Sequence, residues 1–331
     1  MRTPKFWYNQ KSSALSFLLA PLGRVYGLTH NIIHKFTKPW QSPIPVICVG
    51  NLVAGGHGKT PAALSICNIL KSNSKAVHFI SRGYKGSLSG PLLVDPKIHT
   101  ANEVGDEPLL LSEIAPTWIS ANREASIILA HKMGAEIIIM DDGFQNPSVK
   151  KDLSIIVVDG EVGFGNGHLI PAGPLREDMA TGLSRASAII IIGEDKLDLK
   201  LKLSNFIPYP PQEPLMLITA QLKPVANPQS ISKKKVLAFT GIGRPEKFFD
   251  TLAKMNCNII RTKSFADHHQ YTKKEIASLH TIARRDNAQL ITTSKDYVRL
   301  TASQQKYIIA VPVILDWEDS SSLDGLLRPF I

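Results

Sequence analysis

The chain has 331 residues, of which 44% are hydrophobic, and its formal net charge is +10. This length and apolar content favour two domains with a substantial core and exclude a disordered chain. The positive charge indicates an anionic partner, but nucleic acid, acidic lipid and phosphorylated substrates all fit. The three cysteines lack the paired spacing of zinc or redox sites, so we interpret them as reduced residues of a cytosolic protein.

The first 40 residues contain an amphipathic stripe. Between Lys5 and Lys38, apolar side chains recur at a roughly helical period: Leu15, Leu18, Leu19, Leu22, Tyr26, Ile33 and Phe36. The longest nearly uncharged stretch is far shorter than the ~20 apolar residues of a spanning helix, and Pro21 interrupts it. Basic residues flank the stripe, which predicts either an interfacial helix on anionic headgroups or an arm packed on its own domain.

Short apolar runs then alternate with helical patterns, which is typical of a doubly wound α/β sheet. The predicted buried strands are Val46 to Val49, Ala76 to Ile80, Glu136 to Met140, Leu153 to Val158 and Ala188 to Ile192. A polar, proline-bearing stretch over residues 194–213 indicates a linker. Further strands are expected at Val236 to Phe239, Gln289 to Thr292 and Tyr307 to Leu315. We therefore predict an N-terminal arm (1–40), a P-loop domain (41–212) and a smaller α/β domain (213–331).

A phosphate-binding loop is predicted directly after the first strand. Its residues are Gly55, Gly56, His57, Gly58, Lys59 and Thr60. Glycines let backbone N–H groups turn inward, and the following helix directs its positive dipole end at the same point. Lys59 is expected to reach the β and γ phosphates of ATP, and Thr60 to bind Mg²⁺. The GxxxxGKT pattern requires glycine at position 53, where this chain has Val53, so the loop is irregular.

Two carboxylates follow another predicted strand. Asp141 and Asp142 end the run Ile137 to Met140, at the carboxyl edge of the sheet where Mg²⁺ needs an acidic ligand. Gln145 follows closely and is a candidate for orienting a nucleophile or a water. A strand that merely ends in solvated acids is the simpler alternative.

Phosphoryl transfer to an alcohol also needs a base near the acceptor. Asp106 and Glu107 precede an apolar run, where they are candidates for catalysis or simply for the start of a helix. Asp267 and His268 lie before Thr272, which begins a predicted capping box, so they belong to a loop between strand and helix. Their alternative role is to bond the loop backbone.

Two further loops are candidates for substrate binding. The glycine-rich segment 163–177 ends in Arg176 and Glu177 and is suited to a polar acceptor. The basic loop 81–86 contains Arg82 and suits a phosphate group, although a solvated surface loop is nearly as good an interpretation.

Six motifs occur in order behind the N-terminal stripe: GGHGKTP, SRGYKG, EVGDEP, DDGFQ, GNGHLIPAGPLRE and DHHQYT. In register over about residues 44–299, they make the chain resemble the tetraacyldisaccharide 4'-kinases, the lipid A 4'-kinase family. The resemblance implies a P-loop NTPase-like fold. It also implies transfer, with Mg²⁺, of the ATP γ-phosphate to the 4'-hydroxyl of a tetraacyldisaccharide 1-phosphate, giving lipid IVA.

The resemblance further implies roles for particular residues. Asp106 would take the proton of the sugar hydroxyl, with His268 supporting it and Asp267 orienting the imidazole. The remaining catalytic residues would be Glu107 and Asp142. The nucleotide would be bound by the phosphate loop and Gln145, and the metal by Thr60, Asp141 and Asp142. The substrate ligands would be Arg82, Arg123, Arg176 and Glu177.

A substrate with four acyl chains stays in the bilayer, so the resemblance favours the interfacial interpretation of the arm and explains the positive charge. The expected partners are the glycolipid and an anionic lipid surface, with no nucleic acid, and the expected protein is a monomer bound peripherally or monotopically at the cytoplasmic face of the bacterial inner membrane. The alternative is a membrane-associated P-loop ATPase of the partitioning or metallochaperone type. Such proteins carry a lysine where this chain has Ala54, which argues against that class.

Overall fold

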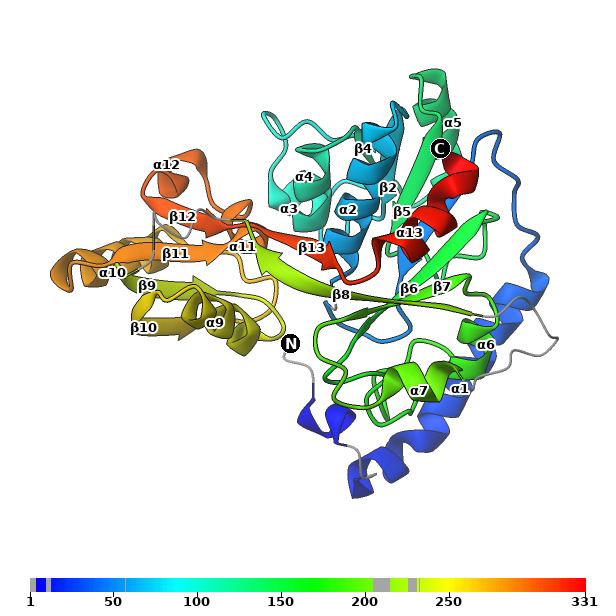
Figure 1. Ribbon diagram of the computed structural model, residues 1–331, viewed down its shortest axis with the longest axis horizontal. Coiled ribbons are helices and arrows are strands. Elements are labelled where there is room, and N and C mark those ends of the chain that lie inside the picture. Colours follow the sequence, from blue (N-terminus) through cyan, green and yellow to red (C-terminus); the bar gives the residue numbers. More distant parts are fainter. Residues whose placement is uncertain (1–3, 10–12, 57, 205–214, 226–230, 232) are drawn as a thin grey trace.

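The computed structural model describes residues 4–9, 13–56, 58–204, 215–225, 231 and 233–331, which form two lobes (Figure 1). The strands of the large lobe are β1 (Val46–Gly50), β2 (Val77–Ser81), β3 (Leu92–Leu93), β4 (Thr117–Ile119), β5 (Ile137–Asp141), β6 (Leu153–Asp159), β7 (Ala188–Ile192), β8 (Met216–Pro224) and β13 (Val313–Trp317). They form one sheet in the order β13-β8-β7-β6-β1-β5-β2-β4-β3. The inner strands are parallel, whereas β13 and β3 pair antiparallel at the two edges.

Helices cover both faces of this sheet. One face carries α2 (Lys59–Ser72), α4 (Asp106–Ser112) and α13 (Ser320–Leu327), and the other carries α5 (Arg123–Lys132), α6 (Met179–Leu183) and α7 (Leu199–Ser204). In β1, Ile47 and Val49 face the first layer, while Val46 and Cys48 face the second. All four side chains are fully buried, because a parallel sheet is apolar on both faces. The prediction of a doubly wound α/β fold is confirmed.

The small lobe (residues 231–312) has its own parallel sheet in the order β10-β9-β11-β12. Its elements are β9 (Lys235–Thr240), α9 (Pro245–Lys254), β10 (Asn258–Ser264), α10 (Lys273–Arg285), β11 (Gln289–Thr293), α11 (Ser294–Tyr297), α12 (Ala302–Gln305) and β12 (Ile308–Val311). Helices α9 and α10 bury their apolar residues against opposite faces of this sheet.

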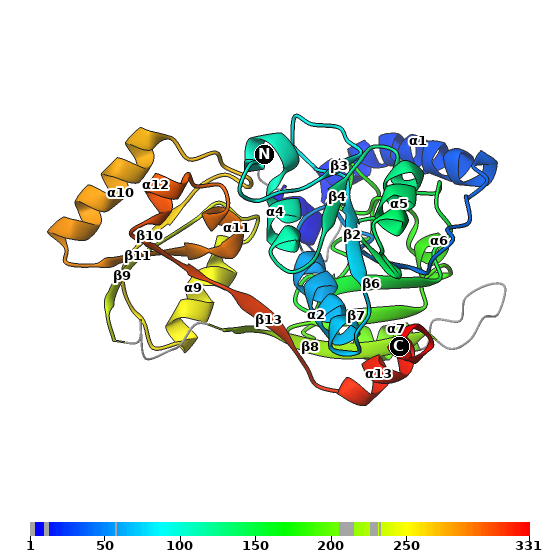
Figure 2. The same ribbon diagram turned by 90° about the horizontal axis from the view of Figure 1, so that it is seen from above.

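The predicted boundary at residue 212 does not separate the two sheets. Strand β8 lies beyond it and still pairs with β7 of the large sheet. The run Tyr307 to Leu315, predicted as one strand, divides at Pro312 into β12 of the small sheet and β13 of the large sheet. Figure 2 shows β8 and β13 side by side between the lobes. The small lobe is therefore inserted into the large one, which periodicity could not reveal because it carries no strand order.

The N-terminal stripe forms a short 3-10 helix, η1 (Lys5–Tyr8), and one long helix, α1 (Ala14–Phe36), which runs along the outside of the large lobe (Figure 2). Pro21 lies inside α1 without ending it, since a proline removes one backbone hydrogen bond and the rest of this long helix remains. The buried side of α1 consists of the small residues Ser16, Gly23 and Gly27. Among the described residues, no helix is long and apolar enough to cross a membrane.

Candidate active site

The phosphate loop connects β1 to α2, as predicted. Gly55 and Gly58 have φ angles of 123° and 88°, which glycine adopts without the steric cost that a side chain brings. Helix α2 then begins at Lys59. Predicted loop residue His57 lies outside the described residues. The irregular Val53 is buried and forms a bridge with Leu175, so it anchors the segment 163–177 against the phosphate loop.

Asp141 and Asp142 meet the start of α2, because β5 is the immediate neighbour of β1 in the sheet. The Thr60 hydroxyl donates to Asp141 Oδ2 at 3.0 Å, while the other carboxylate oxygen, Oδ1, is buried and has no hydrogen-bond partner among the described residues. Burial, aided by Asp142, raises the pKa of Asp141 to about 7. A hydroxyl beside an orphaned carboxylate oxygen is the donor set that Mg²⁺ prefers.

The second carboxylate is already paired with cations. Asp142 Oδ1 lies 2.7 Å from Arg176 and 3.5 Å from Lys59 Nζ. Burial opposes ionisation of Asp142, but Lys59 and Arg176 outweigh it and hold the pKa at about 2. Arg176, predicted as a substrate ligand from the glycine-rich segment, therefore lies beside Lys59 and Asp142 at the phosphate loop.

Gln145 and Glu177 are hydrogen-bonded to each other near the carboxyl end of β5. The Gln145 amide donates to the backbone oxygen of Asn51 at 2.7 Å and to Glu177 at 2.9 Å, and its own oxygen accepts from Arg176 at 3.3 Å. Glu177 is fully buried, pairs with Arg185 and does not line the large cavity that lies between the two lobes. The prediction of Glu177 as a substrate ligand is therefore wrong for this arrangement, because its carboxylate is used to fix Gln145.

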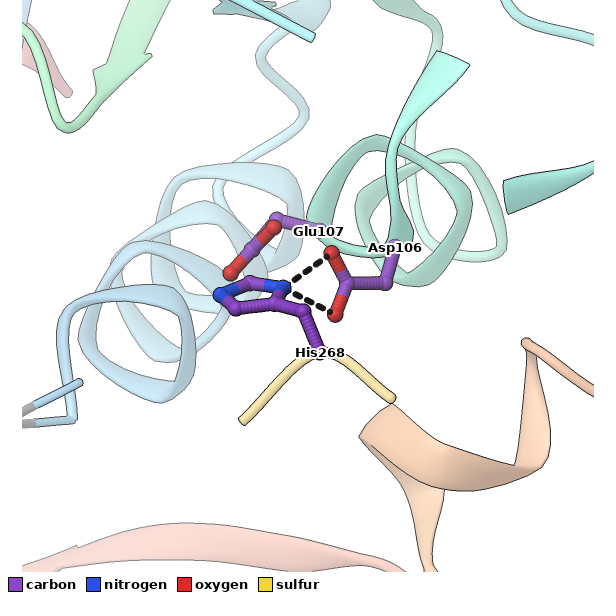
Figure 3. A group of neighbouring side chains, drawn as sticks. All are labelled: Asp106, Glu107 and His268. Carbon is purple, nitrogen blue, oxygen red and sulfur yellow. Dashed lines mark hydrogen bonds and ion pairs between the residues drawn. The ribbon is translucent and has the colours of Figure 1, made fainter. Parts of the chain in front are cut away.

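Asp106 and His268 meet across the lobes, as Figure 3 shows. His268 Nδ1 lies 3.1 and 3.0 Å from the two carboxylate oxygens of Asp106, although 162 positions separate the residues. Asp106 is the first residue of α4, but its carboxylate is turned to the small lobe. Asp267 is 3.9 Å from Nε2, beyond hydrogen-bond distance. Asp106, and not Asp267 as predicted, therefore orients the imidazole.

Two cations that the sequence reasoning missed complete this cluster. Arg299 donates from Nε to Asp106 Oδ2 at 3.0 Å, and Lys295 Nζ lies 2.6 Å from Glu107. Burial opposes ionisation of Asp106, but His268, Lys295 and Arg299 outweigh it and hold its pKa well below the usual range. The geometry of Asp106, Glu107 and His268 would admit a metal ion, but two cations already neutralise the acids. The sequence offers one signal for this cluster: the charged residues Lys295 and Asp296 follow β11 after a single serine.

The remaining predicted ligands, Arg82 and Arg123, follow β2 and β4. Arg123 is 5% exposed and donates to the Ser120 carbonyl, and burial together with Arg82 lowers its pKa to about 10. Arg82 is exposed. Both line one cavity of about 1500 Å³ between the lobes, together with the phosphate loop and His268. Asp106 lies behind His268 and does not line this cavity.

A glycine loop, an acidic strand end and a histidine held by an aspartate, all at one cavity, define a phosphotransferase of the P-loop class. The family model of the tetraacyldisaccharide-1-P 4'-kinases matches residues 15–331. The tetraacyldisaccharide 4'-kinases of Rhodospirillum centenum and Rhodospirillum rubrum are each 44% identical, with all of this chain and 97% and 98% of theirs covered. A crystal structure of an "apo" form of LpxK from Aquifex aeolicus in complex with ATP superposes with a TM-score of 0.75, at 26% identity over 95% of this chain and 99% of that one. The chain belongs to the tetraacyldisaccharide 4'-kinase family, which confirms the resemblance.

Proposed function

We propose that this kinase transfers the γ-phosphoryl group of ATP to the 4'-hydroxyl of a tetraacyldisaccharide 1-phosphate, using the residues of the interlobe cavity. The observation that carries the proposal is the placement of His268 and the phosphate loop on one cavity. The O–P bond to the γ-phosphorus breaks toward ADP, a new bond forms to the sugar oxygen, and the hydroxyl proton leaves to a base.

The phosphate loop and the end of β5 hold the nucleotide. Lys59 reaches the phosphates after exchanging its 3.5 Å contact with Asp142. Thr60 and the unpaired Oδ1 of Asp141 fit Mg²⁺, with Asp142 beside them. When bound, the ion neutralises charge on the phosphates. Arg176 supplies a second cation at this edge, where negative charge builds up during transfer.

The Asp106–His268 pair accepts the hydroxyl proton. Carboxylate oxygens only accept hydrogen bonds, so Nδ1 carries the hydrogen that faces Asp106, and Nε2 is left as an acceptor. Asp106 was predicted as the base itself. Because its pKa is depressed and it lies behind the imidazole, we propose that the two residues act as a unit, with His268 nearest the substrate.

Arg82 and Arg123 are proposed to bind the anionic acceptor. They follow neighbouring strands, β2 and β4, so their side chains reach the same end of the cavity. The guanidinium of Arg123 is desolvated, and a desolvated cation gains most from an anionic ligand.

Helix α1 is proposed to lie on the membrane that holds this glycolipid. Its exposed apolar side chains include Phe17 at 81%, Leu18 at 74% and Phe36 at 79% exposure. A helix with one side docked by small residues and a large apolar face exposed to solvent is typical of an interfacial helix. This face and the basic flanks support a peripheral or monotopic association with anionic lipid. We further propose that the protein is a monomer at the cytoplasmic face of the bacterial inner membrane and binds no nucleic acid.

The deciding experiment is ATP turnover with and without a tetraacyldisaccharide 1-phosphate in detergent micelles. A phosphorylated glycolipid is expected. Release of free phosphate without that product would favour the P-loop ATPase alternative. For the base, Asp106→Asn and His268→Gln are each expected to lower kcat by ~10² or more while ATP still binds. Unchanged turnover in both variants would reject the pair as the base.

Membrane binding is tested by flotation with vesicles that contain anionic lipid. The double variant Phe17→Ser/Leu18→Ser is expected to float less, and Ile98→Ser, which changes an apolar residue 72% exposed on the large lobe, serves as the matched control. Equal flotation of both variants would reject α1 as the contact.

A further inference from the structure

Asp296 is a fully buried carboxylate in α11 that the proposed chemistry does not use. Its oxygens accept hydrogen bonds from Thr240 Oγ1 (2.5 Å), the Gly241 N–H (2.9 Å), Tyr271 Oη (2.8 Å), Thr293 Oγ1 (2.7 Å) and Arg299 (2.8 Å). Four of these donors are neutral, so Arg299 provides the positive charge that a buried carboxylate requires.

Arg299 lies between two buried carboxylates, one in each lobe. One end of its guanidinium donates to Asp296 Oδ1 and to the carbonyl of Gly241 at 2.9 Å. The other end donates to Asp106 through Nε at 3.0 Å and through a second, shorter contact from Nη2. The Arg299 side chain is inaccessible to solvent. A planar guanidinium fixed at one end by Asp296 therefore fixes the position of Asp106 Oδ2 at the other.

The two Arg299 contacts fall on the same oxygen of Asp106. Both Nε and Nη2 donate to Oδ2, and Lys295 Nζ is 3.8 Å from that atom as well. His268 Nδ1 lies 3.0 Å from Oδ2 and 3.1 Å from Oδ1. The carboxylate cannot rotate without breaking two charge-assisted hydrogen bonds, so the imidazole that it supports is held toward the cavity.

We propose that Asp296 and Arg299 are positioning residues, which set the Asp106–His268 pair for proton transfer and do so only when the small lobe is docked on the large one. This inference rests on the proposed function, because it assigns a purpose to the same pair. It follows that lobe docking and assembly of the base are one event: His268, Lys295 and Arg299 all come from the small lobe, and Asp106 and Glu107 from α4.

A plain structural role for Arg299, joining the lobes, predicts a different result. If Arg299 only holds the lobes together, its loss weakens folding or nucleotide binding and leaves the pH dependence of kcat unchanged. A positioning role changes the pH dependence as well, since the guanidinium also holds the Asp106 pKa down. Lys295, Glu107 and Asp267 also face the pair. They are not mutated in any Arg299 variant, so a shift of the pH dependence of kcat reports on the loss of Arg299.

The experiment compares full-length Arg299→Gln, Arg299→Lys and Tyr271→Phe with wild type, measuring kcat and the KM for ATP across pH. The matched control is Arg261→Gln, which removes an arginine 52% exposed from its ion pair with Asp286 on the same lobe. Arg299→Gln is expected to lower kcat by ~10², with the KM for ATP little changed. The acid limb of the kcat–pH profile of this variant is expected to move to higher pH, because removal of a cation favours the protonated form of the Asp106–His268 pair. Arg299→Lys should have a higher kcat than Arg299→Gln, and Tyr271→Phe should lower kcat less than either of them.

A kcat for Arg299→Gln within ~3-fold of wild type overturns the inference, as does a loss of kcat with an unmoved acid limb, since positioning effects on a base are commonly ~10². If Arg299→Gln does not fold, as judged by thermal melting with ATP, Arg299→Lys carries the test through kcat, because lysine keeps the charge but not the planar fork that joins the two carboxylates. A kcat for Arg299→Lys within ~3-fold of wild type then overturns the inference. Failure of the proposed function is separate from this: there, wild type itself makes no phosphorylated glycolipid.

Discussion

The imidazole of His34, near the end of α1, lies 3.2 Å from the backbone oxygen of Gln145. Its other nitrogen, Nδ1, accepts a hydrogen bond from Arg185 at 3.1 Å, and Arg185 in turn pairs with Glu177 below the phosphate loop. Because Glu177 holds the Gln145 side chain at 2.9 Å, the amphipathic helix and the phosphate site share one hydrogen-bond network.

Replacing His34 with alanine is expected to lower glycolipid kinase activity by ~10-fold. A distant mutation that displaces an active-site group by ~1 Å can lower the rate by as much as ~10²-fold. Flotation with vesicles should not change, because the exposed apolar face of α1 is intact. Lys35→Ala, on the exposed side of the same turn, is the control. Equal activity of the two variants would show that the network does not reach the site.

Docking of α1 is expected to weaken as pH falls. Burial, Arg185, His30 and Lys151 lower the pKa of His34 to about 4, against the opposing effect of the Gln145 carbonyl. The freed helix would take up a proton at the ordinary value of 6.5, so the docked state loses stability from about pH 6.5 down to about 4. Hydrogen exchange of the α1 amides at several pH values measures this. His34→Gln should flatten the pH dependence, and an unchanged slope would contradict the assignment.

A side chain at position 23 of α1 should undock the helix. A Cβ there would lie 3.0 Å from the backbone oxygen of Leu169, which cannot move as a side-chain end can. Gly23→Leu is therefore expected to destabilise docking by ~1–3 kcal/mol, as overpacking usually does. Thr29→Leu, which adds bulk on the exposed face, is the matched control. Proteolysis of α1 in the two variants compares them, and identical cleavage rates would show that the close packing is unimportant.

The Mg²⁺ requirement should depend on Asp141. Chelation of divalent ions is expected to stop product formation, and added Mg²⁺ to restore it. Asp141→Asn should raise the Mg²⁺ concentration for half-maximal activity by ~10-fold or more, on the scale of lost metal-site contacts. The exposed Asp198, whose φ of 53° asparagine tolerates, gives the control Asp198→Asn. A half-maximal concentration equal to that of wild type would remove Asp141 from the metal site.

Local pattern was enough to predict the strands that carry the site. Runs such as Ile137 to Met140 are short, wholly apolar and bounded by turn residues, so their burial between helix layers follows from composition. Asp141 and the phosphate loop were found for the same reason, since both follow directly from strands whose carboxyl ends share an edge. Pro312 shows the limit: one apolar run supplies strands to two sheets.

What the sequence determined by itself is the P-loop class, the family and the ends of the central strands, because those features depend on neighbours along the chain. Tertiary structure alone decided that Glu177 supports Gln145, that Asp106 orients His268, and that Arg299 lies between two carboxylates. These pairings join residues 32, 162 and 193 positions apart. Burial of a charge requires a partner in space, and only the folded chain determines which distant residue provides it.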